Sequence, residues 1–194
     1  MQLDYNQSVS VTPMSYKKWV LVAISLFVIG LIVGFVAPAS SVISEDITAL
    51  EEFGSMLTSQ PPIVAAILIF ARNASVLVFS FLLSPILCLL PIAVLTVNGW
   101  VIAFVAALVA EITSVGFVLA ALLPHGIVEI PALILGEAAA LSFGSIVITG
   151  IFNKQKRGLI IPNLKHNLRY LAISLALLLP AAFIETFVTP LFAA

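Results

Sequence analysis

Long apolar stretches separated by short polar stretches are the main pattern of this chain. Residues 19–36 are almost continuously apolar, and a polar stretch at 39–60 follows them. Residues 61–152 are apolar with few interruptions, and a basic stretch at 153–169 precedes a last apolar run at 170–192. A transmembrane helix needs about 20 consecutive apolar residues. The pattern therefore predicts several membrane-spanning helices.

The charges between the apolar runs predict how often the chain crosses the membrane. Lys and Arg concentrate on the cytoplasmic side of membrane proteins. The run at 61–152 follows a stretch rich in Asp and Glu and ends at a basic stretch, so it crosses an odd number of times. Three crossings fit its length, whereas five would leave no room for turns. We therefore expect five spans, with the N-terminus cytoplasmic and the C-terminus outside.

Turn-forming residues predict where the helices end. The long run is interrupted by Pro85, by Asn98-Gly99 and by Pro124-His125-Gly126. We expect a single all-α domain over residues 1–194, a polytopic membrane helix bundle of about five transmembrane helices with one or more broken or half-helices. The expected spans are 19–37, 63–83, 100–123, 127–152 and 170–190, with a possible re-entrant piece at 87–97.

Composition supports a membrane protein and argues against several other classes. Hydrophobic residues make up 62% of the 194 positions, charged residues make up 9%, and the mean hydropathy is +1.23. Soluble domains are about 45–50% apolar and about 25% charged. The net charge of -1 and the lack of a basic arm give no sign of a nucleic-acid partner. The single cysteine excludes an intrachain disulfide.

Ionisable side chains within the spans are the candidate functional residues. A charge at the centre of a transmembrane helix costs about 2.5–3.5 kcal/mol on insertion scales, so each must be protonated, paired, hydrated or bound to a cation. The predicted polar intramembrane site comprises Arg72, Asn73, Asn98, Glu111, His125, Glu129, Glu137 and Glu185.

Several roles remain open for these residues. His125 and Glu129 are four residues apart and share a helix face, where they form either a functional site or a structural helix cap. Glu111 and Glu137 either make hydrogen bonds between helices or carry protons. Arg72 is expected to pair with one of the carboxylates. The sequence leaves open whether a metal binds, and it indicates no cofactor.

Small residues predict where helices approach one another closely. A ridge of small side chains at every fourth position lets a neighbouring helix pack tightly. The neighbour is either a helix of the same chain or one of a second copy. The two predicted packing ridges are Ala132, Gly136, Ala140 and Gly144, and Gly30 with Gly34.

Three motifs give the chain a resemblance to a known family. They are "FARNASVLVFSFLLSPILCLLPIAVLTVNGWVIAF", "LLPHGIVEIPALILGEAAALSFG" and "AAFIETFVTP". On these motifs the chain resembles the stage II sporulation protein M family of integral membrane proteins. Family members usually have a small residue where this chain has Glu137, and Gly where it has Leu141. The resemblance implies a small polytopic protein of the cell membrane.

The resemblance does not fix an activity. The family's namesake works with peptidoglycan-degrading proteins during engulfment, but relatives occur widely in bacteria and archaea that do not sporulate. We therefore expect a non-enzymatic scaffold or complex subunit, with the lipid bilayer and other membrane proteins or a second copy as partners. The alternative is a small transporter or channel with a polar site near His125, Glu129 and Glu111. An intramembrane enzyme is disfavoured because no HExxH motif is present and no Asp lies within a span.

Overall fold

The computed structural model describes residues 15–36, 56 and 59–192 of the chain. It is 92% helical, and within the described residues no strand occurs. Five helices are long and apolar enough to cross a membrane, as the sequence predicts. The elements are α1 (Tyr16–Val36), α3 (Pro62–Leu83), α4 (Leu89–Ile112), α5 (Val115–Phe152), the 3₁₀ helix η2 (Lys154–Leu159), α6 (Ile160–Phe183), the π-helical turn η3 (Ile184–Val188) and α7 (Thr189–Phe192).

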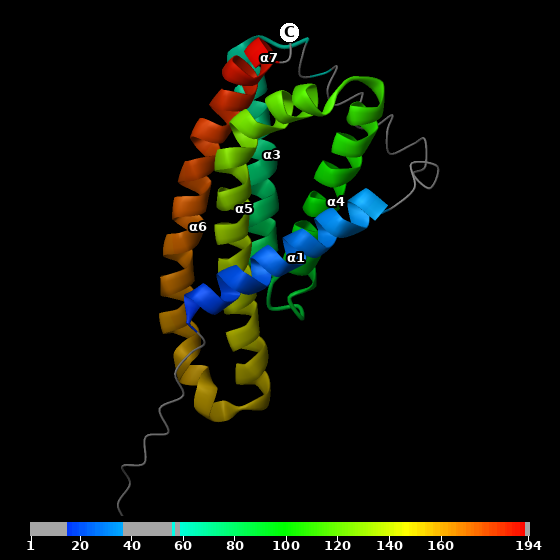
Figure 1. Cartoon of the computed structure of the whole chain (residues 1–194). Coiled ribbons are helices and arrows are strands. Elements are labelled where there is room, and N and C mark those ends of the chain that lie inside the picture. Colours follow the sequence, from blue (N-terminus) through cyan, green and yellow to red (C-terminus); the bar gives the residue numbers. More distant parts are fainter. Residues whose placement is uncertain (1–14, 37–55, 57–58, 193–194) are drawn as a thin grey trace, which may run out of the picture.

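Helix α5 is the centre of the bundle. It packs against α1, α3, α4 and α6. Figure 1 shows α3, α5 and α6 running side by side, while α1 crosses α4 and α5 at a steep angle. Helices α3 and α4 diverge from the turn that joins them (Figure 1). Helix α5 therefore contacts all the other long helices, whereas α3 and α4 separate with distance from their turn.

Small side chains explain why α5 occupies the centre. Ala132 and Ala140 are fully buried, and a Cβ atom at Gly136 would lie 2.8 Å from the Ser174 hydroxyl of α6. A Cβ atom at Gly144 would collide with the carbonyl oxygen of Ser84. This ridge therefore packs against other helices of the same chain.

The close crossing of α1 and α4 depends on three glycines. A Cβ atom at Gly30 would collide with the carbonyl oxygen of Thr96, and one at Gly34 with that of Trp100. Gly99 approaches α1 from the other side, because its Cβ atom would collide with the carbonyl oxygen of Phe27. Contacts this close between backbones are possible only where side chains are absent.

The predicted re-entrant piece at 87–97 is wrong. These residues form the last part of a short turn and the first half of α4, which runs without a break for 24 residues. The Asn98 amide donates to the carbonyl oxygen of Val94 in its own helix, at 2.7 Å. The neighbouring Gly99 allows α4 to pack closely against α1. The Asn-Gly pair is therefore a packing feature and makes no turn.

The predicted span at 100–123 is also wrong, because the break comes earlier. Helix α4 ends at Ile112, and Ser114 has an extended backbone, with φ -152° and ψ 157°. The Ser114 hydroxyl accepts a hydrogen bond from the backbone N–H of Phe117 at 3.2 Å, which is the N-cap of α5. Helix α5 therefore begins after Ser114, which lies ten residues before the expected turn at Pro124.

The predicted turn at Pro124-His125-Gly126 is wrong in the same region. Helix α5 continues through Pro124 and Pro131 for 38 residues, about 57 Å at 1.5 Å per residue. That length exceeds the hydrocarbon thickness of about 30 Å. Figure 1 shows that the first part of α5 is tilted relative to the rest of the helix. Proline bends a helix without ending it where the neighbours allow.

The last span begins earlier than the predicted 170–190. Helix α6 starts at Ile160, so much of the expected basic loop is helical. After Pro180 the chain forms the π-helical turn Ile184–Val188 and then the short helix α7. The acidic stretch used in the topology prediction falls largely outside the described residues.

Candidate polar cleft within the helix bundle

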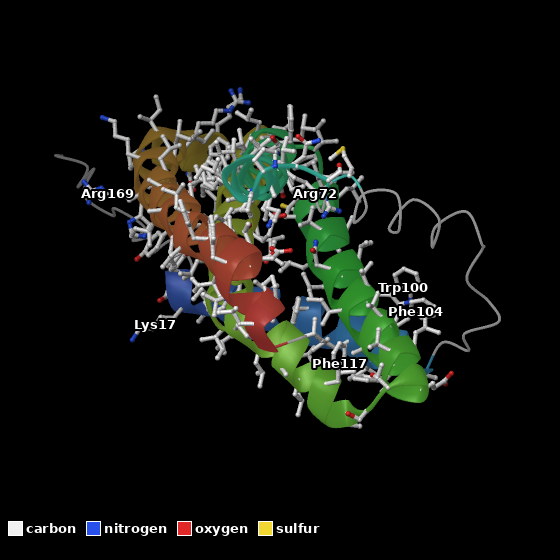
Figure 2. The ribbon with its side chains drawn as sticks, turned by 90° about the horizontal axis from the view of Figure 1, so that it is seen from above. Lys17, Arg72, Trp100, Phe104, Phe117 and Arg169 are labelled. Atoms are coloured by element: carbon white, nitrogen blue, oxygen red, sulfur yellow. The ribbon has the colours of Figure 1, made fainter. Side chains whose placement is uncertain are left out.

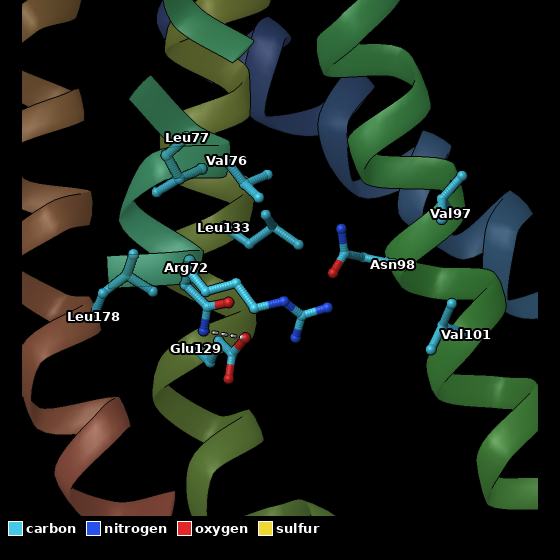
Figure 3. Close-up of a pocket in the computed structure, with 10 residues that line it drawn as sticks. Arg72, Val76, Leu77, Val97, Asn98, Val101, Glu129, Leu133 and Leu178 are labelled. Carbon is cyan, nitrogen blue, oxygen red and sulfur yellow. Dashed lines mark hydrogen bonds between the residues drawn. The ribbon is translucent and has the colours of Figure 1, made fainter. Parts of the chain in front are cut away.

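A polar cleft of about 260 Å³ lies between α3, α4 and α5, where α3 and α4 diverge. Four of the predicted site residues line it: Arg72 and Asn73 from α3, Asn98 from α4 and Glu129 from α5. Figure 3 shows the side chains of Arg72, Asn98 and Glu129 converging from the three helices. Its walls are apolar and are formed by Val76, Leu77, Val97, Val101, Leu133 and Leu178.

The base of the cleft is held by a hydrogen bond between α3 and α5. The Asn73 amide donates to Glu129 Oε1 at 3.0 Å, and both side chains are half-buried (Figure 3). The two residues are 56 positions apart in the chain. An amide N–H fixes the orientation of the carboxyl group, which keeps Glu129 turned toward the cleft.

Arg72 and Asn98 provide the opposite side of the cleft. Figure 3 shows the Arg72 side chain extending from α3 toward α4, with its guanidinium group facing Asn98. Arg72 is exposed, and Asn98 is half-buried. Arginine offers five N–H donors, and the Asn98 amide keeps its carbonyl oxygen as an acceptor while its NH₂ group binds Val94. The cleft therefore presents donors and acceptors between apolar walls.

Glu137 belongs to a different polar contact. Its carboxyl group accepts a hydrogen bond from the Ser80 hydroxyl of α3, and both side chains are fully buried. The second carboxyl oxygen, Oε1, has no hydrogen-bond partner among the described residues. This contact ties α3 to α5, and neither Ser80 nor Glu137 lines the cleft.

The other predicted residues do not line the cleft. Glu111 is exposed and lies at the end of α4, not near the middle of a span as the predicted boundaries required. Glu185 is half-buried in the π-helical turn. His125 lies within α5 one turn before Glu129, but its side chain lies outside the described part of the structure.

Comparison with known proteins gives the family. The family of stage II sporulation protein M matches residues 23–190 of the chain. The chain belongs to this family. Neither the curated proteins nor the solved structures contain a match to it. The matched residues include all four polar residues of the cleft, so the cleft lies within the region that the family of stage II sporulation protein M matches.

The sequence analysis missed a second polar cluster in this family member. Ser142 on α5 accepts hydrogen bonds from the side-chain amides of Asn163, at 3.5 Å, and Asn167, at 3.2 Å, on α6. Asn167 and Ser142 are buried. The available signal was the spacing of the two asparagines, which are four residues apart and share a helix face. Their segment was interpreted as a loop.

The described residues contain no group of three or more His, Cys, Asp and Glu side chains arranged to hold a metal ion. The polar lining of the cleft offers hydrogen bonding and charge. A guanidinium group, two amides and a carboxyl group lie in a cleft with apolar walls. Such an arrangement binds a polar or charged group carried by an otherwise apolar molecule.

Proposed function

We propose that this protein is a non-enzymatic subunit of a membrane complex, and that the polar cleft between α3 and α4 binds a transmembrane segment of its partner. The observation that carries the proposal is the opening of the cleft at the side of the bundle. Arg72 is exposed there, within a helix long enough to span a membrane. Ionisable residues within transmembrane segments face other helices or a water-filled cavity, so we expect this side of α3 to be covered.

A transmembrane helix of the partner would fit against the cleft and cover its polar groups. Polar side chains that meet between transmembrane helices contribute about 0.6 kcal/mol each on average, and up to about 1.7 kcal/mol. The apolar walls beside them, formed by Val76, Val97 and Val101, supply a surface on which a helix packs. The family resemblance also implies work within a complex. The proposed orientation in the cell membrane places the basic end in the cytoplasm and the C-terminus outside.

Site-specific photo-crosslinking tests this proposal. A photoreactive amino acid replaces Val97, which lines the cleft and is 53% exposed, and the protein is irradiated in its native membrane. The control carries the same amino acid at Ile32 of α1, which is 58% exposed and does not line the cleft. We expect a protein adduct from position 97 and lipid adducts from position 32. Lipid adducts alone from both positions would contradict the proposal.

A charge variant gives a second test of the partner site. Arg72→Gln should reduce the amount of the crosslinked partner that co-purifies, because it removes the charged group from the cleft. Lys154→Gln is the matched control, since it removes an exposed positive charge that does not line the cleft. Equal recovery of the partner with wild type and Arg72→Gln would show that the cleft does not bind it.

Transport is the second candidate function. The observation that favours it is the cleft of about 260 Å³ that Glu129 lines. On this proposal the cleft is one end of a path for a small polar solute or an ion. Glu129→Gln keeps the size of the side chain and removes its charge. A flux in proteoliposomes that the wild type supports and Glu129→Gln abolishes would favour transport. Equal flux with both proteins would remove it.

A further inference from the structure

A second pocket, of about 250 Å³, lies between the start of α1, α5 and the first turns of α6. Its polar lining consists of Ser15, Tyr16, Ser142, Asn163 and His166. None of these residues lines the cleft of the proposed function. The pocket therefore requires its own explanation.

The interior side of the pocket is a fixed network that offers a hydrogen-bond donor. Ser142 accepts from the side-chain amides of Asn163 and Asn167. Asn167 is fully buried, and its amide also donates to Asn163 Oδ1 at 2.9 Å. A serine hydroxyl has two acceptor sites and one donor. With both acceptor sites occupied, the Ser142 proton is left for an acceptor in the pocket.

An aromatic cluster forms another wall and fixes its shape. Tyr16 stacks on Tyr170 with ring centroids 3.6 Å apart and an interplanar angle of 10°. The His166 ring meets Tyr16 edge-on, at 6.1 Å and 86°. The Tyr16 hydroxyl donates to the carbonyl oxygen of Leu135 at 2.7 Å, which ties the start of α1 to α5. Contacts within the chain therefore hold this wall of the pocket in place.

The surroundings of the pocket are positively charged. Every Lys and Arg of the chain except Arg72 lies in residues 17–18 or 154–169, and no Asp or Glu occurs in residues 15–36 or 138–184. Lys17 follows Tyr16, and Lys165 and Arg169 flank His166 on α6. Figure 2 shows Lys17 and Arg169 on the same side of the molecule, away from Trp100 and Phe104 of α4. An anion is attracted to this side.

Exposed apolar side chains lie on the same helices as the pocket lining. Ile161 and Leu168 of α6 are 62% and 44% exposed, and Leu21 of α1 is 63% exposed. In a membrane these side chains contact acyl chains. A ligand with a phosphate group and two acyl chains therefore fits the surroundings better than a soluble anion.

We propose that this pocket binds the phosphate headgroup of an anionic membrane lipid. The Ser142 hydroxyl and the Asn163 amide donate to the phosphate oxygens, while Lys17, Lys165 and Arg169 supply the charge. Basic pockets between transmembrane helices on the cytoplasmic side bind anionic headgroups in this way. The site is separate from the cleft, so the proposal does not depend on the proposed function.

Native mass spectrometry of the full-length protein in detergent tests the proposal. The probes are phosphatidylglycerol, phosphatidylcholine and inorganic phosphate. We expect phosphatidylglycerol to bind about tenfold more tightly than phosphatidylcholine, since only the former is a net anion. Equal binding of the two lipids would overturn the proposal. Binding of inorganic phosphate that is as tight as that of phosphatidylglycerol would overturn the assignment to a lipid.

Matched variants separate the pocket from the general positive charge. Ser142→Ala with His166→Ala removes polar groups from the pocket lining, and it should weaken binding of phosphatidylglycerol about tenfold. Lys154→Ala with Lys156→Ala removes two charges from the same end of the bundle, but neither residue lines the pocket. An equal loss in both variants would overturn the proposal, because binding would then follow net charge alone.

Photo-labelling of the wild type keeps the proposal testable if the pocket variant does not fold. Phosphatidylglycerol with a photoreactive headgroup is bound to the protein, crosslinked and mapped by peptide sequencing. We expect labels in the peptides that contain Tyr16 and Asn163. Labels confined to α3 and α4 would overturn the proposal.

Discussion

Ser80 of α3 and Glu137 of α5 meet inside the bundle, where the hydroxyl donates to the carboxyl group and solvent reaches neither side chain. They are 57 positions apart in the chain. One carboxyl oxygen has this single partner, and the other has none among the described residues. The polar contact of Glu137 with α3 therefore depends on one hydroxyl group.

Ser80→Ala should destabilise the protein by about 1–3 kcal/mol, the cost of leaving a buried polar group without its partner. The measurement is reversible unfolding in detergent micelles. Ser75→Ala is the matched control. The Ser75 hydroxyl is exposed and donates to the carbonyl oxygen of Ala71 in its own helix, so the control should change the free energy of unfolding by less than about 0.5 kcal/mol. An equal change in the free energy of unfolding in the two variants would show that the contact between Ser80 and Glu137 does not stabilise the protein.

Gly99→Ala should also destabilise the protein, by about 1–3 kcal/mol, because its Cβ atom would collide with the backbone of α1. Gly30→Ala should act similarly at the carbonyl oxygen of Thr96. The control is Gly158→Ala, since nothing lies within 4 Å of a Cβ atom placed there. Thermal unfolding in detergent measures all three. A melting temperature unchanged in Gly99→Ala would contradict the close crossing.

The sequence predicted the helical class and five helices long enough to span a membrane, because these depend on composition and length alone. It failed at the boundaries around residues 87–123, where a contact between distant parts of the chain decides the structure. Asn98-Gly99 has the composition of a turn, but the role of Gly99 is set by a helix 72 positions earlier, at Phe27. Such a contact leaves no local signal. Ser114 did leave one, since a serine at a helix start is a common N-cap.

The sequence identified polar residues of the candidate site, but it did not predict which of them lie together. Arg72, Asn73, Asn98 and Glu129 stand out as polar residues in apolar runs, and the structure brings them together. Glu137 stands out equally, but it packs against Ser80. The sequence alone cannot assign these partners, because the rotation of each helix about its axis depends on the packing of the whole bundle.

Asn73 and Glu129 should be energetically coupled. A double-mutant cycle with Asn73→Ala, Glu129→Ala and the double variant isolates their hydrogen bond of 3.0 Å. We expect a coupling free energy of about 0.6–1.7 kcal/mol, the range found for hydrogen bonds between transmembrane helices. The control cycle pairs Asn73→Ala with Ser80→Ala on the same helix. A coupling no larger than in the control would show that the bond is absent in the membrane.

The Cys88 thiol should react slowly with maleimide reagents. Cys88 lies in the turn between α3 and α4, where it is buried against α5 and its hydrogen bond to the carbonyl oxygen of Leu141 measures 3.7 Å. Burial raises the pKa of the thiol above its ordinary value. The reactive thiolate is then scarce at neutral pH, so the labelling rate should rise only as the pH becomes alkaline. Ile86→Cys in a Cys88→Ser background is the control, since Ile86 is 60% exposed.

Labelling from the two sides of the membrane tests the proposed orientation. The turn between α3 and α4 and the connection between α5 and α6 are separated by the two crossings of α4 and α5, so they should lie on the same side. In a Cys88→Ser background, Ile86→Cys and Gln155→Cys should therefore be labelled by an impermeant maleimide only after the cytoplasmic side is opened. Thr113→Cys, in the connection between α4 and α5, should be labelled in intact cells. Labelling of Ile86→Cys and Thr113→Cys from the same side would show that α4 does not cross, and the count of five spans would then fail.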